Sequence, residues 1–353
     1  MKKDAYLNEI SLAVPEHDIH RKFIDFAPSL LKDDRSRALF RRMAERCQID
    51  HRYSCINPHV EAGKLDRDGF YGANGFPDTQ MRMKLYQQHA FSLARKALDG
   101  LRLGEIKDEV THLIVTTCTG FYAPGLDLEI IDHYKLNPSV ERTVIGFMGC
   151  YAGMNALKLA RHIVRSDAGA RVVILNLELC TLHLQETGSL EQMLSFLLFA
   201  DGCSASLVSA DPAGIEMQSF RSAVMPESEG HITWSIGGSG FDMHLSGQVP
   251  PTIAAGLPGS LPAILAGDST DRFRHWAIHP GGRTVLDAVR EGAGIPEDTL
   301  AASRDVLRRF GNMSSATIMF VLKKIMQQGA GRGCGMAFGP GLTIESMLFQ
   351  QAA

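Results

Sequence analysis

The sequence predicts an α/β protein made of two similar halves. Short apolar or β-branched runs alternate with helical patterns over most of the 353 residues, which is typical of a largely parallel sheet covered by helices. Phe147-Met-Gly-Cys150 and Phe310-Gly-Asn-Met313 each begin an apolar helix that a short link joins to a strand, and this weak echo indicates duplication. The 45% hydrophobic content is enough for a large core.

The first half is expected to span residues 1–211. Phe23–Gln48 has a helical, basic pattern, and Cys55–Asp78 is rich in Gly, Pro and Asn and is expected to be loop. The other expected helices are Thr79–Leu101, Ala123–Tyr134, Met154–Val164 and Leu190–Phe199, and the strands are Thr111–Cys118, Thr143–Ile145, Arg171–Glu178 and Ser204–Ser209.

The second half is expected to span residues 212–353, because Asp211-Pro212 is the strongest boundary signal. Gly237–Gly240 and Gln328–Gly335 are expected to be glycine-rich loops. The expected helices are Pro250–Ala266, Thr284–Glu291, Asp298–Arg309 and Met313–Gln327, and the strands are Gly214–Ser222, Arg274–His279, Gly335–Phe338 and Leu342–Phe349.

Charge and cysteine content exclude several classes of protein. The net charge is −3 and no long Lys/Arg run occurs, so a nucleic-acid partner is not expected. There is no run of about 18 apolar residues to span a membrane, and the N-terminal residues lack the apolar block of a signal peptide. Seven scattered cysteines without a C-x-x-C motif favour neither a disulfide framework nor a zinc site. We therefore expect a cytoplasmic protein without a metal.

Cys150 is the first candidate for catalysis. It lies between small residues, where the strand at Thr143–Ile145 gives way to the helix at Met154–Val164. At a helix N-terminus, free N–H groups and the helix dipole can bring the pKa of a thiol below about 8.5, and the thiolate is the nucleophile. The alternative is a buried structural cysteine.

His279 and Asn312 are the candidate partners of Cys150. His279 ends a strand before Pro280-Gly281-Gly282, where α/β sheets place their chemistry, although its ring could merely cap the turn. Asn312 precedes a helix, so it is a candidate N-cap as well. A thiol nucleophile needs a base, and an enolate or oxyanion needs hydrogen-bond donors. If the halves are duplicated, a pseudo-twofold axis would bring Cys150 and Asn312 to one cavity.

Four motifs resemble the type III polyketide synthases, the chalcone synthase-like family, and their bacterial members in particular. They are Gly-Cys-Tyr-Ala-Gly at 149–153, Ile-His-Pro-Gly-Gly at 278–282, Gly-Asn-Met-Ser-Ser-Ala at 311–316 and Gly-Pro-Gly-Leu-Thr-Ile-Glu at 339–345. The resemblance extends from about residue 8 to 349. It implies a thiolase-like, five-layered αβαβα fold with two duplicated halves, and a homodimer.

The resemblance also implies roles for single residues. Cys150 would carry the acyl chain, while His279 and Asn312 would hold the malonyl-CoA thioester during decarboxylation. Phe199 matches the gatekeeper phenylalanine of the family, although by pattern alone it is a core aromatic. Arg42 and Arg46 match basic positions that meet the CoA phosphates, although they could belong to a solvated helix face. Apart from the CoA thioester substrates, no cofactor is implied.

Several cavity positions depart from the pattern of the plant chalcone-forming enzymes. The positions are Met243 in place of a second gatekeeper phenylalanine, Trp234 at a position that is small there, Cys180 and His183 in place of two threonines, Ala123 in place of a frequent methionine at the dimer interface, and Cys118, which resembles bacterial members. Each could be ordinary core variation. Trp234 would fill the space that an aromatic starter needs, and flexible Met243 could line an alkyl tunnel.

These departures predict an aliphatic acyl-CoA starter and an alkylpyrone, alkylresorcinol or phloroglucinol-type product. One alternative is a synthase that is primed by malonyl-CoA and makes a naphthalene-type pentaketide. Another is a single condensation like that of β-ketoacyl-acyl carrier protein synthase III, although the asparagine of that class usually lies in Asn-Thr. A hydroxymethylglutaryl-CoA synthase would need a glutamate base that no motif here supplies, and a non-enzymatic scaffold would not need Cys150.

Overall fold

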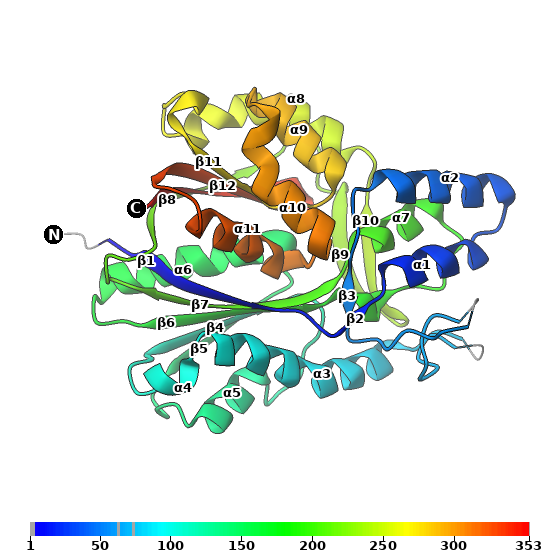
Figure 1. Ribbon diagram of the computed structural model, residues 1–353, viewed down its shortest axis with the longest axis horizontal. Helices are drawn as coiled ribbons and strands as arrows, with labels where there is room; N and C mark the ends of the chain where they lie inside the picture. Colours follow the sequence, from blue (N-terminus) through cyan, green and yellow to red (C-terminus); the bar gives the residue numbers. More distant parts are fainter. Residues whose placement is uncertain (1–3, 62–63, 73–74, 353) are drawn as a thin grey trace.

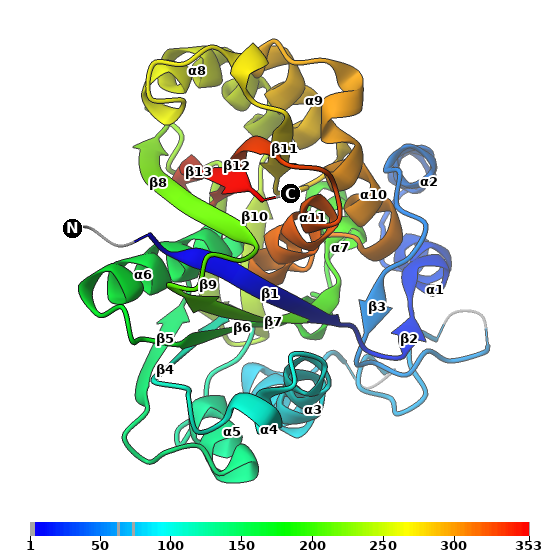
Figure 2. The ribbon, with the colours of Figure 1, turned by 60° about the vertical axis from the view of Figure 1, so that its left-hand side comes forward.

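The computed structural model describes residues 4–61, 64–72 and 75–352. It has five layers (Figure 1). Helices α3 and α5 cover the outer face of one sheet, α6 and α11 lie between the two sheets, and α8 and α9 cover the outer face of the other sheet. Figure 2 shows the same order from a second direction. The expected five-layered α/β fold is therefore confirmed.

The first sheet and its helices come from the N-terminal part of the chain. The elements are β1 (Tyr6–Ala13), β2 (His17–Asp18), α1 (His20–Phe26), α2 (Asp34–Arg46), β3 (Tyr53–Ser54), α3 (Thr79–Gly100), α4 (Leu103–Ile106), β4 (His112–Thr117), α5 (Leu126–Tyr134), β5 (Glu141–Gly146), α6 (Ala152–Ser166), β6 (Val172–Leu179), α7 (Leu190–Leu198) and β7 (Asp201–Ser209).

The second sheet comes from the C-terminal part of the chain. The elements are β8 (Ile215–Val224), β9 (Ile232–Gly237), β10 (Gly240–Leu245), α8 (Val249–Ile264), β11 (His275–Ile278), α9 (Arg283–Ala293), α10 (Ala301–Phe310), α11 (Thr317–Met326), β12 (Gly331–Gly339) and β13 (Thr343–Gln351). The strand order is β11-β12-β13-β8-β1-β7-β6-β4-β5, so the β1–β8 pair joins the two sheets.

The two sheets repeat one topology. In the first sheet β1 is antiparallel to β7, β7 is antiparallel to β6, and β6 is parallel to β4. In the second, β8, β13, β12 and β11 follow in the same order with the same directions. The central helices α6 and α11 hold equivalent places before β6 and β12. The duplication that the sequence echo indicated is thus present in the fold, whereas a domain boundary at 211/212 stays a prediction.

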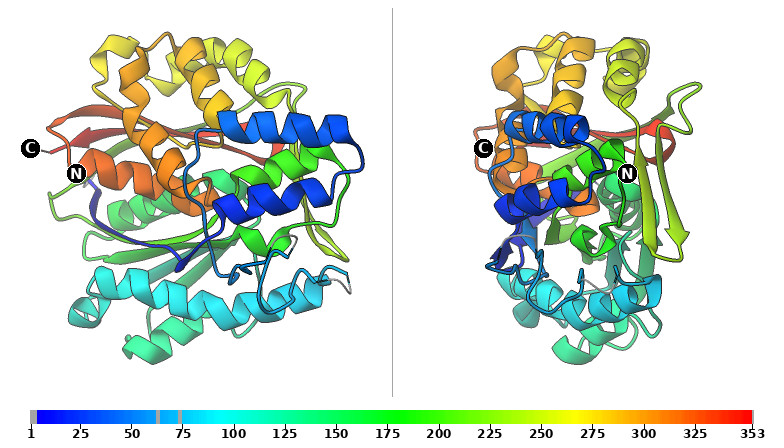
Figure 3. Two further views of the ribbon diagram at one scale, coloured as in Figure 1. Left: turned by 45° about the vertical axis from the view of Figure 1, so that its right-hand side comes forward. Right: turned by 90° about the vertical axis from the view of Figure 1, so that its right-hand side faces the viewer.

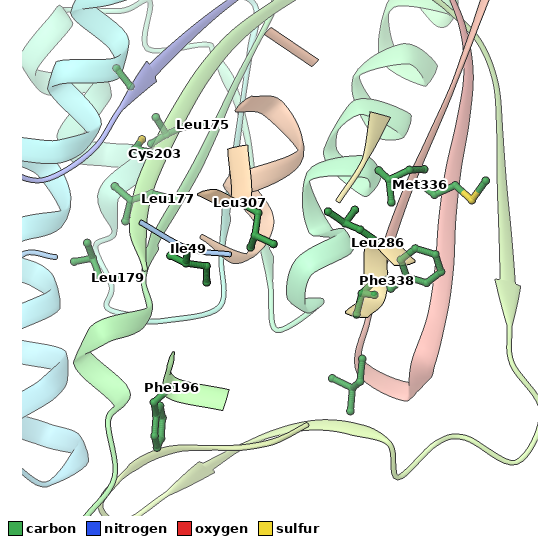
Figure 4. Close-up of a cluster of buried hydrophobic side chains, with 14 of the residues drawn as sticks. Ile49, Leu175, Leu177, Leu179, Phe196, Cys203, Leu286, Leu307, Met336 and Phe338 are labelled. Atoms are coloured by element: carbon green, nitrogen blue, oxygen red, sulfur yellow. The ribbon is translucent and has the colours of Figure 1, made fainter. Parts of the chain in front are cut away.

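The central helices approach each other closely where the halves meet. A Cβ atom on Gly153, in the first turn of α6, would lie 2.5 Å from the Ser315 carbonyl oxygen, so only glycine fits there. Figure 4 shows part of the hydrophobic core nearby, with Leu175, Leu177 and Leu179 of β6 and, from the second half, Met336 and Phe338 of β12.

Two expectations about local structure are wrong. The helix expected at Phe23–Gln48 is broken into α1 and α2, and Pro28 lies in the 3-10 turn that follows α1, since proline removes a backbone donor and disfavours a helix interior. The glycine-rich loop expected at Gly237–Gly240 is present as the turn of a hairpin, β9–β10, whose two strands were not predicted. The glycine-rich segment from residue 331 belongs to β12. Of the expected loop Cys55–Asp78, residues 62–63 and 73–74 lie outside the described residues.

In the part of the chain that the structure describes, no helix is both long and apolar enough to cross a membrane. The seven cysteines are all free.

Candidate active site

Cys150 lies at the end of β5, in a 3-10 turn (Gly149–Tyr151) that leads directly into α6. The turn depends on Gly149, which has φ +71°, and a Cβ atom there would lie 2.2 Å from Cδ of Pro340. Only a glycine tolerates both the left-handed backbone and this close approach. The motif Gly149-Cys150 therefore places the thiol against the segment after β12.

His279 follows the last residue of β11, as expected from the sequence. Its backbone N–H donates to the Met336 carbonyl oxygen at 2.8 Å, which fixes its position beside β12. The side chain is 1% exposed, and within the described residues neither ring nitrogen has a hydrogen-bond partner. Because buried polar groups are nearly always hydrogen-bonded, two free nitrogens in a cavity indicate a ligand site.

Asn312 lies in the turn between α10 and the 3-10 helix Ser314–Ala316. Its Oδ1 accepts from the Ser314 N–H at 2.9 Å and from the Thr317 hydroxyl at 3.4 Å. Its Nδ2 lies 4.0 Å from Cys150 Sγ and 3.4 Å from the Gly281 carbonyl oxygen. Cys150 Sγ lies 4.0 Å from both Oδ1 and Nδ2, so the side chain that caps the turn also meets the thiol.

Cys150, His279 and Asn312 line one apolar cavity. Five of the predicted pocket residues line it too: Cys118, Cys180, Phe199, Trp234 and Met243. The remaining walls include aliphatic and aromatic residues: Phe196, Ile232, Leu245, Val249, Val285 and Phe338. The cavity is narrow, about 60 Å³, which is room for a few water molecules.

His183 does not line this cavity, contrary to the sequence expectation. It is 0% exposed and lies behind Trp234. Its imidazole is held by hydrogen bonds to the Thr119 carbonyl oxygen and the Phe241 N–H, so it turns toward these partners instead of the open space.

The surroundings of Cys150 do not favour the low pKa that was expected from the sequence. Burial is the main cause that raises the pKa of Cys150 to about 12; the Glu178 carboxylate acts in the same direction, and hydrogen bonds from Ser314 and Asn312 oppose it. Cys150 is partly buried and lines the cavity. Burial lowers the pKa of His279 to about 3. In this low-dielectric space both groups are neutral, because desolvation outweighs the helix dipole.

Glu178 is a site residue that the sequence analysis missed. Its carboxylate is 0% exposed and accepts from the Cys118 N–H at 2.9 Å, the Thr119 hydroxyl at 2.9 Å and the Ser315 hydroxyl at 2.5 Å. Burial nevertheless raises its pKa to about 7. The signal in the sequence was a lone acidic residue near the end of a largely apolar strand, because an acidic side chain is almost never fully buried unless it has partners.

Arg52 is a second residue that was missed. It is 2% exposed, and its Nη1 donates to the carbonyl oxygens of Phe196 at 2.8 Å and Phe199 at 2.6 Å. The backbone N–H of Asn312 donates to the same segment, to the Leu198 carbonyl oxygen at 2.8 Å. Arg52 therefore holds the strip of chain that positions both Phe199 and Asn312.

Arg42 and Arg46 lie outside the cavity, on the exposed face of α2. The left panel of Figure 3 shows α2 beside α7, the helix that leads to Phe199. The carbonyl oxygen of Arg46 accepts from Arg283 Nε at 3.0 Å, and Arg283 begins α9, which carries the wall residue Val285. Among the described residues neither Arg42 nor Arg46 forms an ion pair. A role in CoA binding stays a prediction.

The described residues contain no cluster of His, Cys, Asp or Glu suited to a metal ion. The arrangement offers instead a thiol, an imidazole with two free nitrogens and an amide donor around one apolar space. Such a set can carry an acyl group on sulfur and stabilise an oxyanion.

Two family models match this chain. The model of the N-terminal domain of chalcone and stilbene synthases matches residues 4–212, and the model of their C-terminal domain matches residues 216–353. Together they account for most of the sequence.

Similar proteins agree with these matches. The alpha-pyrone synthesis polyketide synthase-like Pks18 of Mycobacterium tuberculosis is 34% identical over 76% of this chain and 72% of its own length. Bisdemethoxycurcumin synthase of Oryza sativa subsp. japonica is 32% identical over 93% of this chain and 87% of its own.

Solved structures show the same fold. PKS-I of the brown alga Ectocarpus siliculosus is 26% identical with a TM-score of 0.89, covering 99% of both chains. The type III polyketide synthase domain of Steely1 from Dictyostelium has a TM-score of 0.89 at 22% identity, covering 99% of this chain and 100% of the domain.

Proposed function

This chain belongs to the chalcone and stilbene synthase family of type III polyketide synthases, and we propose that it extends an acyl group held on Cys150 with units from malonyl-CoA. The observation that carries the proposal is the convergence of Cys150, His279 and Asn312, from three distant segments, on one apolar cavity. As a member of this family, the protein is an acyltransferase.

Loading begins with the neutral thiol of Cys150. The imidazole of His279 accepts the thiol proton while Sγ attacks the carbonyl carbon of the starter thioester. The tetrahedral intermediate collapses, its C–S bond to CoA breaks, and the CoA thiolate takes the proton from the imidazolium. His279 is available for this task because its ring is neutral and, among the described residues, its two nitrogens have no hydrogen-bond partner.

Extension then depends on the amide and imidazole N–H groups. The thioester oxygen of malonyl-CoA lies between Asn312 Nδ2 and His279. The bond to the carboxylate breaks, CO2 leaves, and the electron pair forms an enolate whose negative oxygen accepts from both donors. The enolate carbon attacks the acyl carbon on Cys150, and Sγ leaves as a thiolate that the donors of Asn312 and Ser314 stabilise.

The shape of the cavity supports an aliphatic starter. The Trp234 indole occupies the wall where an aromatic ring would need space, and its Nε1 donates to the Cys118 carbonyl oxygen at 2.8 Å, which holds it there. Met243 and Leu245 on the neighbouring strand are flexible and apolar. An alkylpyrone, alkylresorcinol or phloroglucinol-type product follows from this starter. The name of the Mycobacterium relative, which refers to alpha-pyrone synthesis, agrees with the first of these.

Two further features complete the proposal. Arg42 and Arg46 are offered as the site for the CoA phosphates, because they are exposed and close to the α7 and α9 walls of the cavity.

A homodimer would cover the free edge of the sheet at β5, where Val144 is 50% exposed beside the apolar residues Phe121 and Leu128. Unpaired apolar edges are otherwise an aggregation hazard. The chemistry requires no cofactor beyond CoA thioesters, and the cytoplasmic location stays a prediction.

The test is product analysis with purified protein, malonyl-CoA and a series of acyl-CoA starters of increasing length. We expect extended products from aliphatic starters, and none from Cys150→Ala. Cys334→Ala is the matched control, since that buried cysteine lies on β12 away from the cavity lining. Extended product from Cys150→Ala refutes the proposed chemistry.

The same assay distinguishes the alternative functions. A naphthalene-type pentaketide made from malonyl-CoA alone would show that the enzyme is primed by malonyl-CoA and not by an aliphatic starter. A single condensation that requires malonyl-acyl carrier protein would instead indicate an enzyme that acts like β-ketoacyl-acyl carrier protein synthase III.

A further inference from the structure

One side of helix α2 combines exposed apolar side chains with exposed arginines. Five residues form this side, which we call the α2 face: Arg35, Leu39, Arg42, Met43 and Arg46. Their spacing of four, seven, eight and eleven positions from the first residue places them on one stripe of the helix. The buried residues of α2, Phe40 and Ala44, lie on another side. The α2 face is therefore open to a partner.

The apolar part of the α2 face is two large side chains one turn apart. Leu39 is 41% exposed and Met43 is 38% exposed. The three arginines of the face are exposed too, and none of them forms an ion pair with a described residue. In a chain whose net charge is −3, the face is a local positive patch with an apolar centre.

The other two arginines of α2 have different surroundings. Arg37 forms an ion pair with Asp34 at 2.7 Å, and it donates to the carbonyl oxygens of Pro28 and Leu31. Arg41 lines a groove between α1 and α2. The arginines of the α2 face are thus distinct from these, because no contact within the described residues accounts for their positions.

The α2 face lies beside two walls of the cavity. Helix α2 packs against α7, which leads to the wall residue Phe199. At its C-terminal end, the Arg46 carbonyl oxygen accepts from Arg283 of α9, the helix that carries the wall residue Val285. The left panel of Figure 3 shows α2 on the outside of the molecule, alongside α7. A partner bound to this face would be next to the cavity that contains Cys150.

The composition of the α2 face favours a protein over other partners. The CoA phosphates proposed at Arg42 and Arg46 give no role to Leu39 or Met43. A helix that lies in a membrane needs a broad apolar face, and two apolar residues on a helix packed against the protein are too few. Apolar residues surrounded by arginines are typical of protein interfaces, in which methionine and arginine are enriched.

We propose that the α2 face docks an acyl carrier protein, which delivers the starter acyl group to Cys150. Acyl carrier proteins are small, acidic and helical, so their charge complements the arginines of the face. They hold the acyl group as a thioester on a phosphopantetheine arm, and the reactive end of CoA is the same group. The inference rests on the proposed function, because it names a second donor for the loading step. Malonyl-CoA remains the source of the extender units.

Loading from the carrier uses the same bond changes as loading from CoA. Sγ of Cys150 forms a bond to the acyl carbon while the imidazole of His279 accepts the thiol proton. The bond between the acyl carbon and the phosphopantetheine sulfur then breaks, and this sulfur takes the proton from the imidazolium. The carrier leaves with a free thiol, and no oxidant or reductant is needed.

The test compares two donors of one starter. The purified protein is mixed briefly with octanoyl-CoA, or with the octanoyl-loaded acyl carrier protein of a bacterial fatty acid synthase. Acylation of Cys150 is followed by intact mass, and malonyl-CoA is then added so that extended products can be identified. We expect both donors to acylate Cys150 and to give the same products.

Replacing the apolar centre of the α2 face tests where the carrier docks. Leu39→Gln combined with Met43→Gln keeps good helix formers at both positions. We expect kcat/KM for the loaded carrier to fall about tenfold, as for interface residues that carry binding energy, while kcat/KM for octanoyl-CoA changes by less than about twofold. Met81→Gln is the matched control, because Met81 is 50% exposed on α3, at the outer face of the first sheet. It should leave both donors unaffected.

Reversing one charge tests the electrostatic part of the interface. Arg35→Glu places a negative charge on the α2 face, which should repel an acidic carrier and slow its association about tenfold. The reaction with octanoyl-CoA should be unchanged, since Arg35 is not one of the residues proposed for the CoA phosphates. The matched control is Arg95→Glu, which reverses the charge of an exposed arginine on α3.

The outcomes separate this inference from the proposed function. No acylation and no extended product with either donor would refute the proposed function. Acylation by octanoyl-CoA but not by the loaded carrier would overturn only the carrier inference. Equal losses in the α2 variants and in their α3 controls would also overturn it, as would carrier kinetics that the α2 variants leave unchanged. Co-sedimentation with phosphatidylglycerol vesicles that the α2 variants abolish, without an effect on the carrier, would assign the face to a lipid surface instead.

Discussion

Replacing Glu178 by Gln removes the buried charge near the candidate nucleophile and so tests its effect. The substitution keeps the size of the side chain and can keep its contacts. The amide oxygen can accept from the Cys118 N–H and the Thr119 hydroxyl, while the amide N–H₂ faces the Ser315 hydroxyl, which can accept. The variant therefore removes ionisation at this position with little change in packing.

The magnitude follows from the pKa of Glu178, which burial raises from 4.5 to about 7. Because the pKa of Glu178 is higher in the folded state, the protonated carboxyl contributes fully to the free energy of unfolding below pH 4.5. This contribution is lost as the pH rises through 7. The shift of about 2.5 units at about 1.4 kcal/mol each gives about 3 kcal/mol. Glu178→Gln cannot ionise, so it should gain about 3 kcal/mol in free energy of unfolding over the wild type between pH 4 and pH 8.

Urea unfolding of both proteins across this pH range measures the difference directly. Other groups with shifted pKa values, such as Asp201 and His183, cancel in the comparison because both proteins contain them. A second readout is alkylation of Cys150, which should become faster in Glu178→Gln above pH 7 because the nearby carboxylate raises the pKa of Cys150. Parallel stability curves for the two proteins would refute the buried-charge reasoning.

Three further predictions concern single residues. Asn312→Ala should slow CO2 release from malonyl-CoA about 10²–10³-fold, because one of two enolate donors is lost; a rate near that of the wild type would contradict this role. Arg52→Lys keeps the charge but not the forked donor, so urea unfolding should show a loss of about 1–3 kcal/mol as a buried carbonyl at Phe196 or Phe199 loses its partner, and an unchanged midpoint would argue against it. Alkylation of Cys150 by iodoacetamide should rise steadily past pH 9, as expected for a thiol whose pKa burial raises to about 12; a step near pH 6 would instead reveal a thiolate–imidazolium pair.

The alternation of strands and helices was enough to predict the fold class, because each buried strand reads as an apolar run and each helix as a periodic one. It was not enough for the hairpin β9–β10. Ile232, Trp234 and Ile236 alternate with polar residues on β9, a pattern that is typical of a half-buried strand and that was overlooked. Pro28 was a signal for the break between α1 and α2, although proline alone does not decide, since α8 contains Pro258 and Pro262.

The convergence of Cys150, His279 and Asn312 could be predicted from their motifs and from the duplication. Their ionisation could not, since it depends on how completely the walls exclude water. A helix N-terminus favours a thiolate, yet an apolar lining that includes Phe199 and Phe338 penalises any charge more strongly. The role of Glu178 was hidden for the same reason, because its partners come from two other segments of the chain.

The most direct test of the account is the intact mass of the protein after brief incubation with an aliphatic acyl-CoA, followed by peptide mapping. We expect one acyl group, on Cys150, which malonyl-CoA then converts to heavier adducts and released product. Extended product with the acyl group on Cys118 or Cys180, or with no acylated cysteine, would contradict the account.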